Sequence, residues 1–103
     1  MGQYIIAYFG GEKPSSPEES QAHMENFMAW TGSMGKSVVN QGTPLKGSTL
    51  VTSSGSQEDK DTPWTGFSVI QADSLETAIE FAKKCPHLNI KGILRVAEIK
   101  ELV

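Results

Sequence analysis

The stretch from Thr65 to Leu88 constrains the fold more than any other part of the sequence. It reads TGFSVIQADSLETAIEFAKKCPHL, in which an apolar run is followed by a turn, a helical pattern and a proline. We predict a buried strand over 65–72, because the run is short, apolar and β-branched in part. Asp73 is expected to cap a short helix with Glu76 as its reciprocal partner, and Pro86 to prevent its continuation. The apolar stripe of this helix consists of Leu75, Ala78, Ile79 and Ala82, with Cys85 in line.

The N-terminal part predicts another strand and a longer helix. Tyr4 to Phe9 is a continuous apolar and aromatic run, which is typical of a strand buried on both faces. Ser16 can cap a helix, Pro17 suits its first turn and Glu19 can close a capping box. We expect this helix to run to about Val39, with glycines weakening its second half. Its apolar stripe carries Phe27, Trp30, Thr31, Met34 and Val38, with His23 at the edge.

The remaining segments complete an alternation of strands and helices. Asn40 to Pro44 breaks the first helix, and a weaker strand is expected from Leu45 to Thr52. Ser53 to Asp61 is polar throughout, so we expect a mobile hairpin loop there, with a lid as the alternative. The segment from Ile93 to Ile99 is apolar at nearly every other position, as in a final strand.

The order strand, helix, strand, strand, helix, strand has a simple packing solution. Two right-handed crossovers place four strands in one antiparallel sheet with both helices on the same face. We therefore predict an α+β, ferredoxin-like βαββαβ fold, as one domain over residues 1–103. The uncovered face would expose more apolar surface than soluble monomers usually do, so we predict a homodimer joined through these faces.

Composition excludes several classes of function. The 103 residues are 38% hydrophobic and 20% charged, as in an ordinary soluble domain. The net charge is -3 at pH 7 and the basic residues are dispersed, which argues against nucleic-acid binding. The single cysteine and the lack of a signal-peptide pattern favour the cytoplasm, and no apolar run is long enough to span a membrane. We find no cofactor motif and too few soft ligands for zinc, so neither a cofactor nor a metal is expected.

Two histidines are the candidate catalytic residues. Histidine changes charge near neutral pH, so His23 could act as a general acid or base; otherwise it is a helix-edge residue that shields Phe27. His87 follows Pro86 in a loop and is expected to be the more open of the two. Cys85 and His87 could form a thiolate–imidazole pair, but we favour a buried thiol that packs like a small apolar side chain.

Four aromatic residues could line a pocket for a flat small molecule, whose identity stays open. They are Tyr8, Trp30, Trp64 and Phe67. For Trp30 and Phe67 we favour ordinary positions in the core or the dimer interface. Trp64 lies beside the expected mobile loop, where a tryptophan has little reason to be unless it covers something.

The same segments resemble the YCII-related family, including the branch named for a DGPF motif. The resemblance implies a dimeric α/β barrel made of two ferredoxin-like subunits, with one pocket per subunit. It rests mainly on Gly66–Ile70, Ala72–Ala82 and Cys85-Pro86, with Tyr8-Phe9-Gly10 and Ile93–Val96 consistent with it.

The resemblance also implies a pair of catalytic groups that this chain keeps only in part. Some relatives use a histidine on the first helix and an aspartate just before the proline that follows the second helix. His23 resembles that histidine, whereas Cys85 stands at the position of the aspartate. Of the DGPF motif, only Asp61 and Pro63 remain.

Two functions are consistent with these residues. The first is an enzyme of lyase or hydrolase type, in which His23 moves a proton for an aromatic or otherwise flat substrate. The alternative is a non-catalytic module that keeps the fold but binds a small ligand or a protein partner, which the cysteine at position 85 favours. A heme-degrading or monooxygenase-like barrel shares the architecture, but no cofactor motif supports it. A carboxylate within hydrogen-bond reach of His23 would favour the enzyme.

Overall fold

The computed structural model describes residues 2–60 and 63–100. Its elements are, in chain order, β1 (Gly2–Gly10), α1 (Pro17–Met34), the short 3₁₀ helix η1 (Gly35–Ser37), β2 (Val38–Pro44), β3 (Thr49–Thr52), β4 (Gly55–Glu58), β5 (Trp64–Ala72), α2 (Leu75–Ala82), the 3₁₀ helix η2 (Pro86–Ile90) and β6 (Gly92–Glu98).

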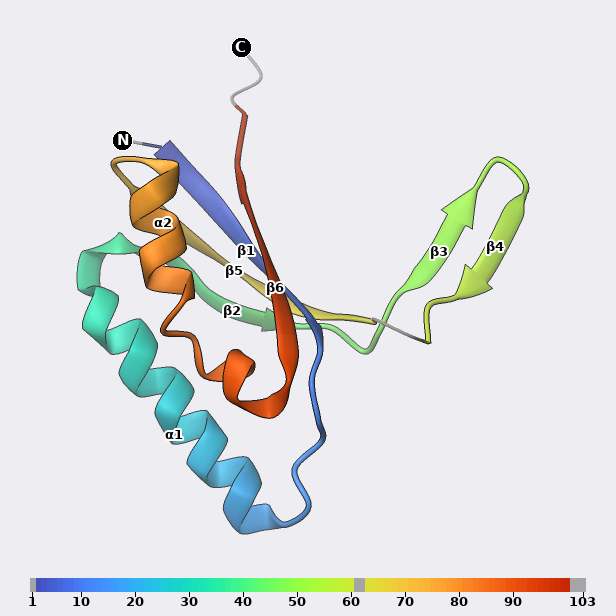
Figure 1. Cartoon of the computed structure of the whole chain (residues 1–103), viewed down its shortest axis with the longest axis horizontal. Helices are drawn as coiled ribbons and strands as arrows, with labels where there is room; N and C mark the ends of the chain where they lie inside the picture. The colour runs from blue at the N-terminus through green and yellow to red at the C-terminus, as the bar shows by residue number, and fades with distance from the viewer. Residues whose placement is uncertain (1, 61–62, 101–103) are drawn as a thin grey trace.

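Four strands form the main sheet in the order β2-β5-β1-β6, and every neighbouring pair is antiparallel. Both helices lie on one side of this sheet (Figure 1). This is the ferredoxin-like arrangement that the sequence predicts, with β1, β2, β5 and β6 as its four strands. β3 and β4 form a separate hairpin that projects away from the sheet (Figure 1).

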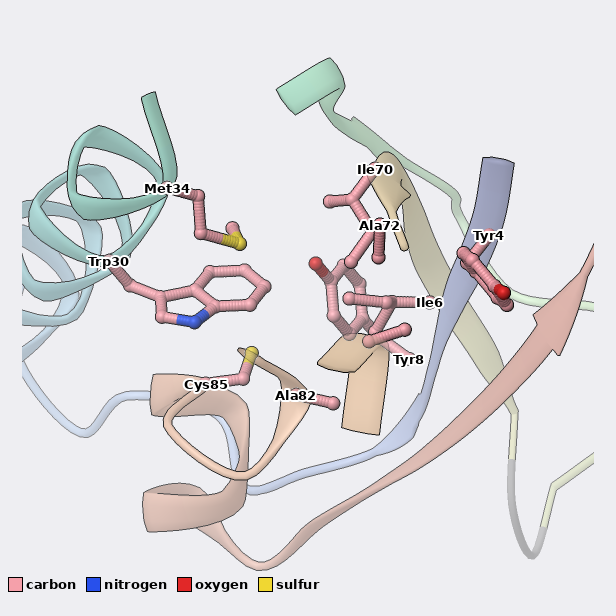
Figure 2. Packing of buried hydrophobic residues seen from close by; sticks show 10 residues of the cluster. Tyr4, Ile6, Tyr8, Trp30, Met34, Ile70, Ala72, Ala82 and Cys85 are labelled. Atoms are coloured by element: carbon pink, nitrogen blue, oxygen red, sulfur yellow. The ribbon is translucent and has the colours of Figure 1, made fainter. Parts of the chain in front are cut away.

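The core lies between the sheet and the two helices (Figure 2). At its centre Ile6 and Ile70, from the adjacent strands β1 and β5, are fully buried. Burying a side chain of this size contributes about 1.5–3 kcal/mol. Trp30 links α1 to α2, because its indole Nε1 donates a 2.9 Å hydrogen bond to the Phe81 carbonyl oxygen. The other buried members of this cluster are Tyr4, Tyr8, Met34, Ala72, Ala78, Ala82 and Cys85.

The first helix is shorter than the sequence predicts. We expected it to reach Val39, but α1 ends at Met34, and the segment 38–44 pairs with β5 as strand β2. Gly35 stops the helix, since it adopts a positive φ of 55° that glycine tolerates better than other residues. The interpretation of 40–44 as a helix breaker was therefore wrong, because pairing with β5 turns the segment into an edge strand.

The expected strand from Leu45 to Thr52 is also wrong in its extent and its partner. Only Thr49–Thr52 is a strand, and it pairs with Gly55–Glu58 rather than with the main sheet. Part of the expected loop is therefore the strand β4, while Asp61 lies outside the described residues. Both strands of the hairpin are exposed along their full length. The hairpin packs on too little of the domain to belong to its core.

The helix caps combine a confirmed prediction with a correction. Ser16 caps α1 as predicted, because its Oγ accepts a 3.1 Å hydrogen bond from the Glu19 N–H. The Glu19 carboxylate accepts from the backbone of Ser15 rather than of Ser16, and this hydrogen bond lowers the pKa of that carboxyl. At α2 the cap is Ser74 and not Asp73, since the Ser74 Oγ accepts from the Thr77 N–H at 3.2 Å.

No helix or strand of the described residues covers the face of the sheet opposite the helices (Figure 1). Ile93 on β6 is 51% exposed and Val39 on β2 is 47% exposed, while Phe9 and Phe67 on this face are only partly buried. We call this surface, which also includes Arg95, the open face. Separately, no helix within the described residues is long and apolar enough to cross a membrane.

The cap of α2 can be tested by a pair of substitutions. We expect Ser74→Ala to lower the free energy of unfolding by about 1 kcal/mol, because the Thr77 N–H loses its acceptor. Asp73→Ala is the matched control and should change stability far less. Urea denaturation followed by circular dichroism measures both. A larger loss for Asp73→Ala than for Ser74→Ala would contradict this assignment of the cap.

Candidate functional site

A cleft of about 390 Å³ opens between α1 and the end of the sheet formed by β2 and β5. Its α1 wall includes His23, Met24, Phe27 and Met28, and its β2 wall spans residues 41–44. Tyr8 of β1 and His87 of η2 also line it. No Lys, Arg, Asp or Glu of the described residues lines the cleft, so its titratable groups are two histidines and a tyrosine.

A chain of hydroxyl groups beside the cleft orients Tyr8. The Ser68 Oγ donates to the Gln41 carbonyl oxygen at 2.8 Å, and it is also hydrogen-bonded to the Tyr8 hydroxyl. Because serine has one hydroxyl proton, which goes to Gln41, the Tyr8 hydroxyl is the donor to Ser68. Burial raises the pKa of Tyr8, so this hydroxyl stays neutral. Tyr8 therefore shapes the cleft but has no free proton to supply.

Cys85 is buried in the core and does not line the cleft. Figure 2 shows its sulfur on the core side of the turn that follows α2, near Trp30. Burial raises the pKa of the Cys85 thiol to about 11, although the His87 backbone N–H opposes this shift. A thiol of this kind is neutral at physiological pH and a poor nucleophile. This geometry agrees with a small apolar side chain rather than a thiolate.

His87 is buried, and the expectation that it would be open was wrong. The 3₁₀ helix η2, which begins at Pro86, includes His87, which is only 8% exposed. Its Nε2 lies 3.0 Å from the Phe9 carbonyl oxygen of β1. The ring also packs against Tyr8, with ring centroids 5.4 Å apart. His87 is thus held in place by contacts with β1 residues that are distant in the sequence.

His23 is partly exposed on α1 and lines the cleft. Within residues 2–60 and 63–100, it forms neither a salt bridge nor a side-chain hydrogen bond, so no carboxylate orients it there. The cleft thus brings together Tyr8, His23 and His87 of the predicted site residues.

The other three predicted site residues lie elsewhere. Trp30 is buried in the core between the helices. Trp64 stacks on Phe9 with ring centroids 5.9 Å apart and contacts Phe67 at 6.4 Å, so these rings gather on the sheet away from the cleft. Arg95 lies over the Phe9 ring, 5.2 Å from its centroid.

Sequence reasoning missed the β2 wall of the cleft. This wall, residues 41–44, was interpreted as the end of a helix, so none of its residues became a candidate. The β-branched pair Val38-Val39 could have signalled a strand there. The two methionines of the α1 wall were missed because they lie off the apolar stripe. As for metal ligands, the described part of the chain contains no group of three or more His, Cys, Asp or Glu side chains that could hold an ion.

Comparison with known proteins agrees with this fold. A solved structure similar to the chain is 5-chloro-2-hydroxyhydroquinone dehydrochlorinase (TftG) from Burkholderia phenoliruptrix AC1100, in complex with 2,5-dihydroxybenzoquinone. The two share 16% sequence identity and a TM-score of 0.60, over 95% of this chain and 93% of that chain. No curated protein sequence matches the chain. The YCII-related domain matches residues 4–103, so the protein belongs to the YCII-related family.

Proposed function

We propose that the protein is an enzyme of lyase or hydrolase type that binds a flat small molecule in the cleft and uses His23 as a general acid or base. The observation that carries this proposal is the position of His23 on a cleft with aromatic and apolar walls. A volume of about 390 Å³ suits a small organic molecule, because ligand pockets commonly measure about 300–1,000 Å³.

The walls favour a planar ligand. Tyr8 and Phe27 meet edge to face with centroids 6.0 Å apart, so the cleft has rigid aromatic surfaces. The similar structure of TftG holds 2,5-dihydroxybenzoquinone, which is a flat ring. Because no charged side chain of the described residues lines the cleft, proton transfer there falls to the histidines. Transfer by one positioned side chain typically contributes about 10²–10⁴-fold to a rate.

A second candidate function is a non-catalytic ligand-binding or protein-interaction module of the same fold. It is favoured by the lack of a carboxylate partner for His23 within the described residues. It is also favoured by Cys85, which stands where the resemblance expects an aspartate. Binding of a flat molecule in the cleft without turnover would distinguish this module from the enzyme.

The cytoplasm is the proposed location. Cys85 is a free, buried thiol, and a reducing compartment keeps such thiols reduced.

The enzyme hypothesis predicts the effect of removing the imidazole. On a substrate that the wild type converts, His23→Ala should lower turnover by about 10²–10⁴-fold. The melting temperature should change little, because His23 is partly exposed and has no partner in the described chain. Chloride release from 5-chloro-2-hydroxyhydroquinone is the first assay to try. Glu25→Ala, also on α1 but outside the cleft, is the control and should keep the rate; an unchanged rate in His23→Ala rules the mechanism out.

We also propose that the protein is a homodimer joined through the open face. Burial of partly exposed aromatic and aliphatic side chains against a second copy would remove apolar surface from water. The open face lies on the opposite side of the sheet from the helices, so such a dimer leaves the α1 wall of the cleft free.

The dimer can be tested by placing a charge on the open face. Ile93→Lys should give monomers, because a lysine buried between the two sheets would lose its hydration. Leu88→Lys on η2 is the matched control, since Leu88 is 41% exposed and Ile93 is 51% exposed. Light scattering coupled to size-exclusion chromatography measures the mass of each. A monomeric wild type, or a dimeric Ile93→Lys variant, contradicts the proposed interface.

A further inference from the structure

We propose that His87, and not His23, is the base that takes a proton from the ligand in the cleft. This inference rests on the proposed function, because it assumes that the cleft binds a small acidic molecule. It assigns the two histidines different roles: His87 as the fixed base, and His23 as the acid at the more exposed wall.

The Phe9 carbonyl determines the tautomer of His87. A carbonyl oxygen can only accept, so the 3.0 Å contact with Nε2 requires that Nε2 carries the proton and donates it. The neutral imidazole then has its lone pair on Nδ1. A carbonyl that holds the distal N–H of a histidine plays the orienting part that a carboxylate plays in a serine protease triad. His87 therefore has the orienting acceptor that His23 lacks.

The Nδ1 atom is available to a ligand. It has no hydrogen-bond partner among the described residues. Yet no fully buried side-chain nitrogen or oxygen in the described chain lacks a partner. Nδ1 is therefore reached by solvent, and His87 lines the cleft. His87, although almost buried, therefore keeps one basic nitrogen in contact with solvent, on a side chain that lines the cleft.

Two glycines hold the ring in place. A Cβ atom at Gly92 would collide with the His87 ring, and one at Gly11 would lie 2.9 Å from its Cε1. The backbone therefore approaches the ring so closely that it leaves no room for other side chains. Tyr8 packs on the ring as well. Such a fixed ring loses little orientational freedom when the ligand binds, which favours proton transfer.

The proton balance of the step is simple. The O–H bond of a phenol or enol breaks, an N–H bond forms at Nδ1, and an oxyanion remains beside an imidazolium. The imidazolium keeps its Nε2–H bond to the Phe9 carbonyl. No fixed charge of the described residues lines the cleft to compete with this ion pair. The ligand class that fits is a flat, weakly acidic hydroxy compound.

The first test measures the tautomer in the free wild-type protein. Long-range ¹H–¹⁵N NMR correlation at a pH where the ring is neutral should show a protonated Nε2 and an unprotonated Nδ1 for His87. The opposite tautomer overturns the inference, whatever the cleft binds. Because it uses the unmodified protein, this test does not depend on the folding of a variant.

The second test follows the proton with 4-nitrophenol, whose phenolate form absorbs visible light. At a pH where free 4-nitrophenol is mostly neutral, binding to the wild type should produce the phenolate band. His87→Gln keeps a donor for the Phe9 carbonyl but no base, so the band should be lost. Glu25→Gln, on α1 but outside the cleft, is the matched control and should retain the band.

The outcomes separate the two proposals. Shifts of the Met24 and Met28 methyl signals on adding 4-nitrophenol locate the ligand in the cleft. If these methyls shift but His87→Gln keeps the phenolate band, the inference fails while the proposed cleft stands. If the methyls do not shift, the cleft does not bind this acidic phenol, and the proposed ligand class and the inference that rests on it both fail.

Discussion

The position of β1 between β5 and β6 determines most of this structure. A central strand has its backbone groups paired on both sides, and its successive side chains point to opposite faces of the sheet. Its apolar side chains must therefore be covered on both faces or remain in contact with water. The inner face carries Ile6 and Tyr8, and α1 and α2 cover it. The outer face carries Phe9, which is partly buried by Trp64 and Arg95. The core, the cleft and the open face therefore all contain side chains of this one strand.

The cleft and the core share a boundary at Tyr8. Its ring belongs to the core, while it also lines the cleft. Its hydroxyl donates a hydrogen bond to Ser68, and the His87 ring packs against its own ring. The next residue, Phe9, supplies the carbonyl that holds His87. The last residues of β1 therefore contribute both to the stability of the domain and to the geometry of the proposed site.

How much could be predicted from the sequence depends on how local the determining contacts are. The strand and helix of 65–82 could be predicted, since their signals are adjacent in the chain. The strand β2 was missed, because Val38 also continues the helical stripe of α1. The β-branched pair Val38-Val39 is only a weak local signal for the extended backbone that pairing with β5 produces. The burial of His87 was equally hidden, since it depends on Gly11 and on the Phe9 carbonyl. His23 could be placed on α1, but its lack of a partner in the described chain is a property of the folded structure.

The resemblance implies an aspartate at position 85, and the fold shows what the cysteine found there does instead. Cys85 is a neutral thiol in the core, so this position supplies no charge to the cleft. Two residues later the chain provides a histidine whose orienting partner is a backbone carbonyl. A site of this kind can move a proton without a carboxylate, and it suits a weak acid better than a ligand with a fixed charge.

We propose that the cleft between α1 and the β2–β5 end of the sheet is the ligand site, with His87 as its proton acceptor. A crystal structure of the protein soaked with 4-nitrophenol tests this assignment. We expect the ring in the cleft beside Tyr8 and Phe27, with a ligand oxygen about 2.6–3.2 Å from the His87 Nδ1. A ligand bound on the open face, or one in the cleft that contacts only His23, would contradict it.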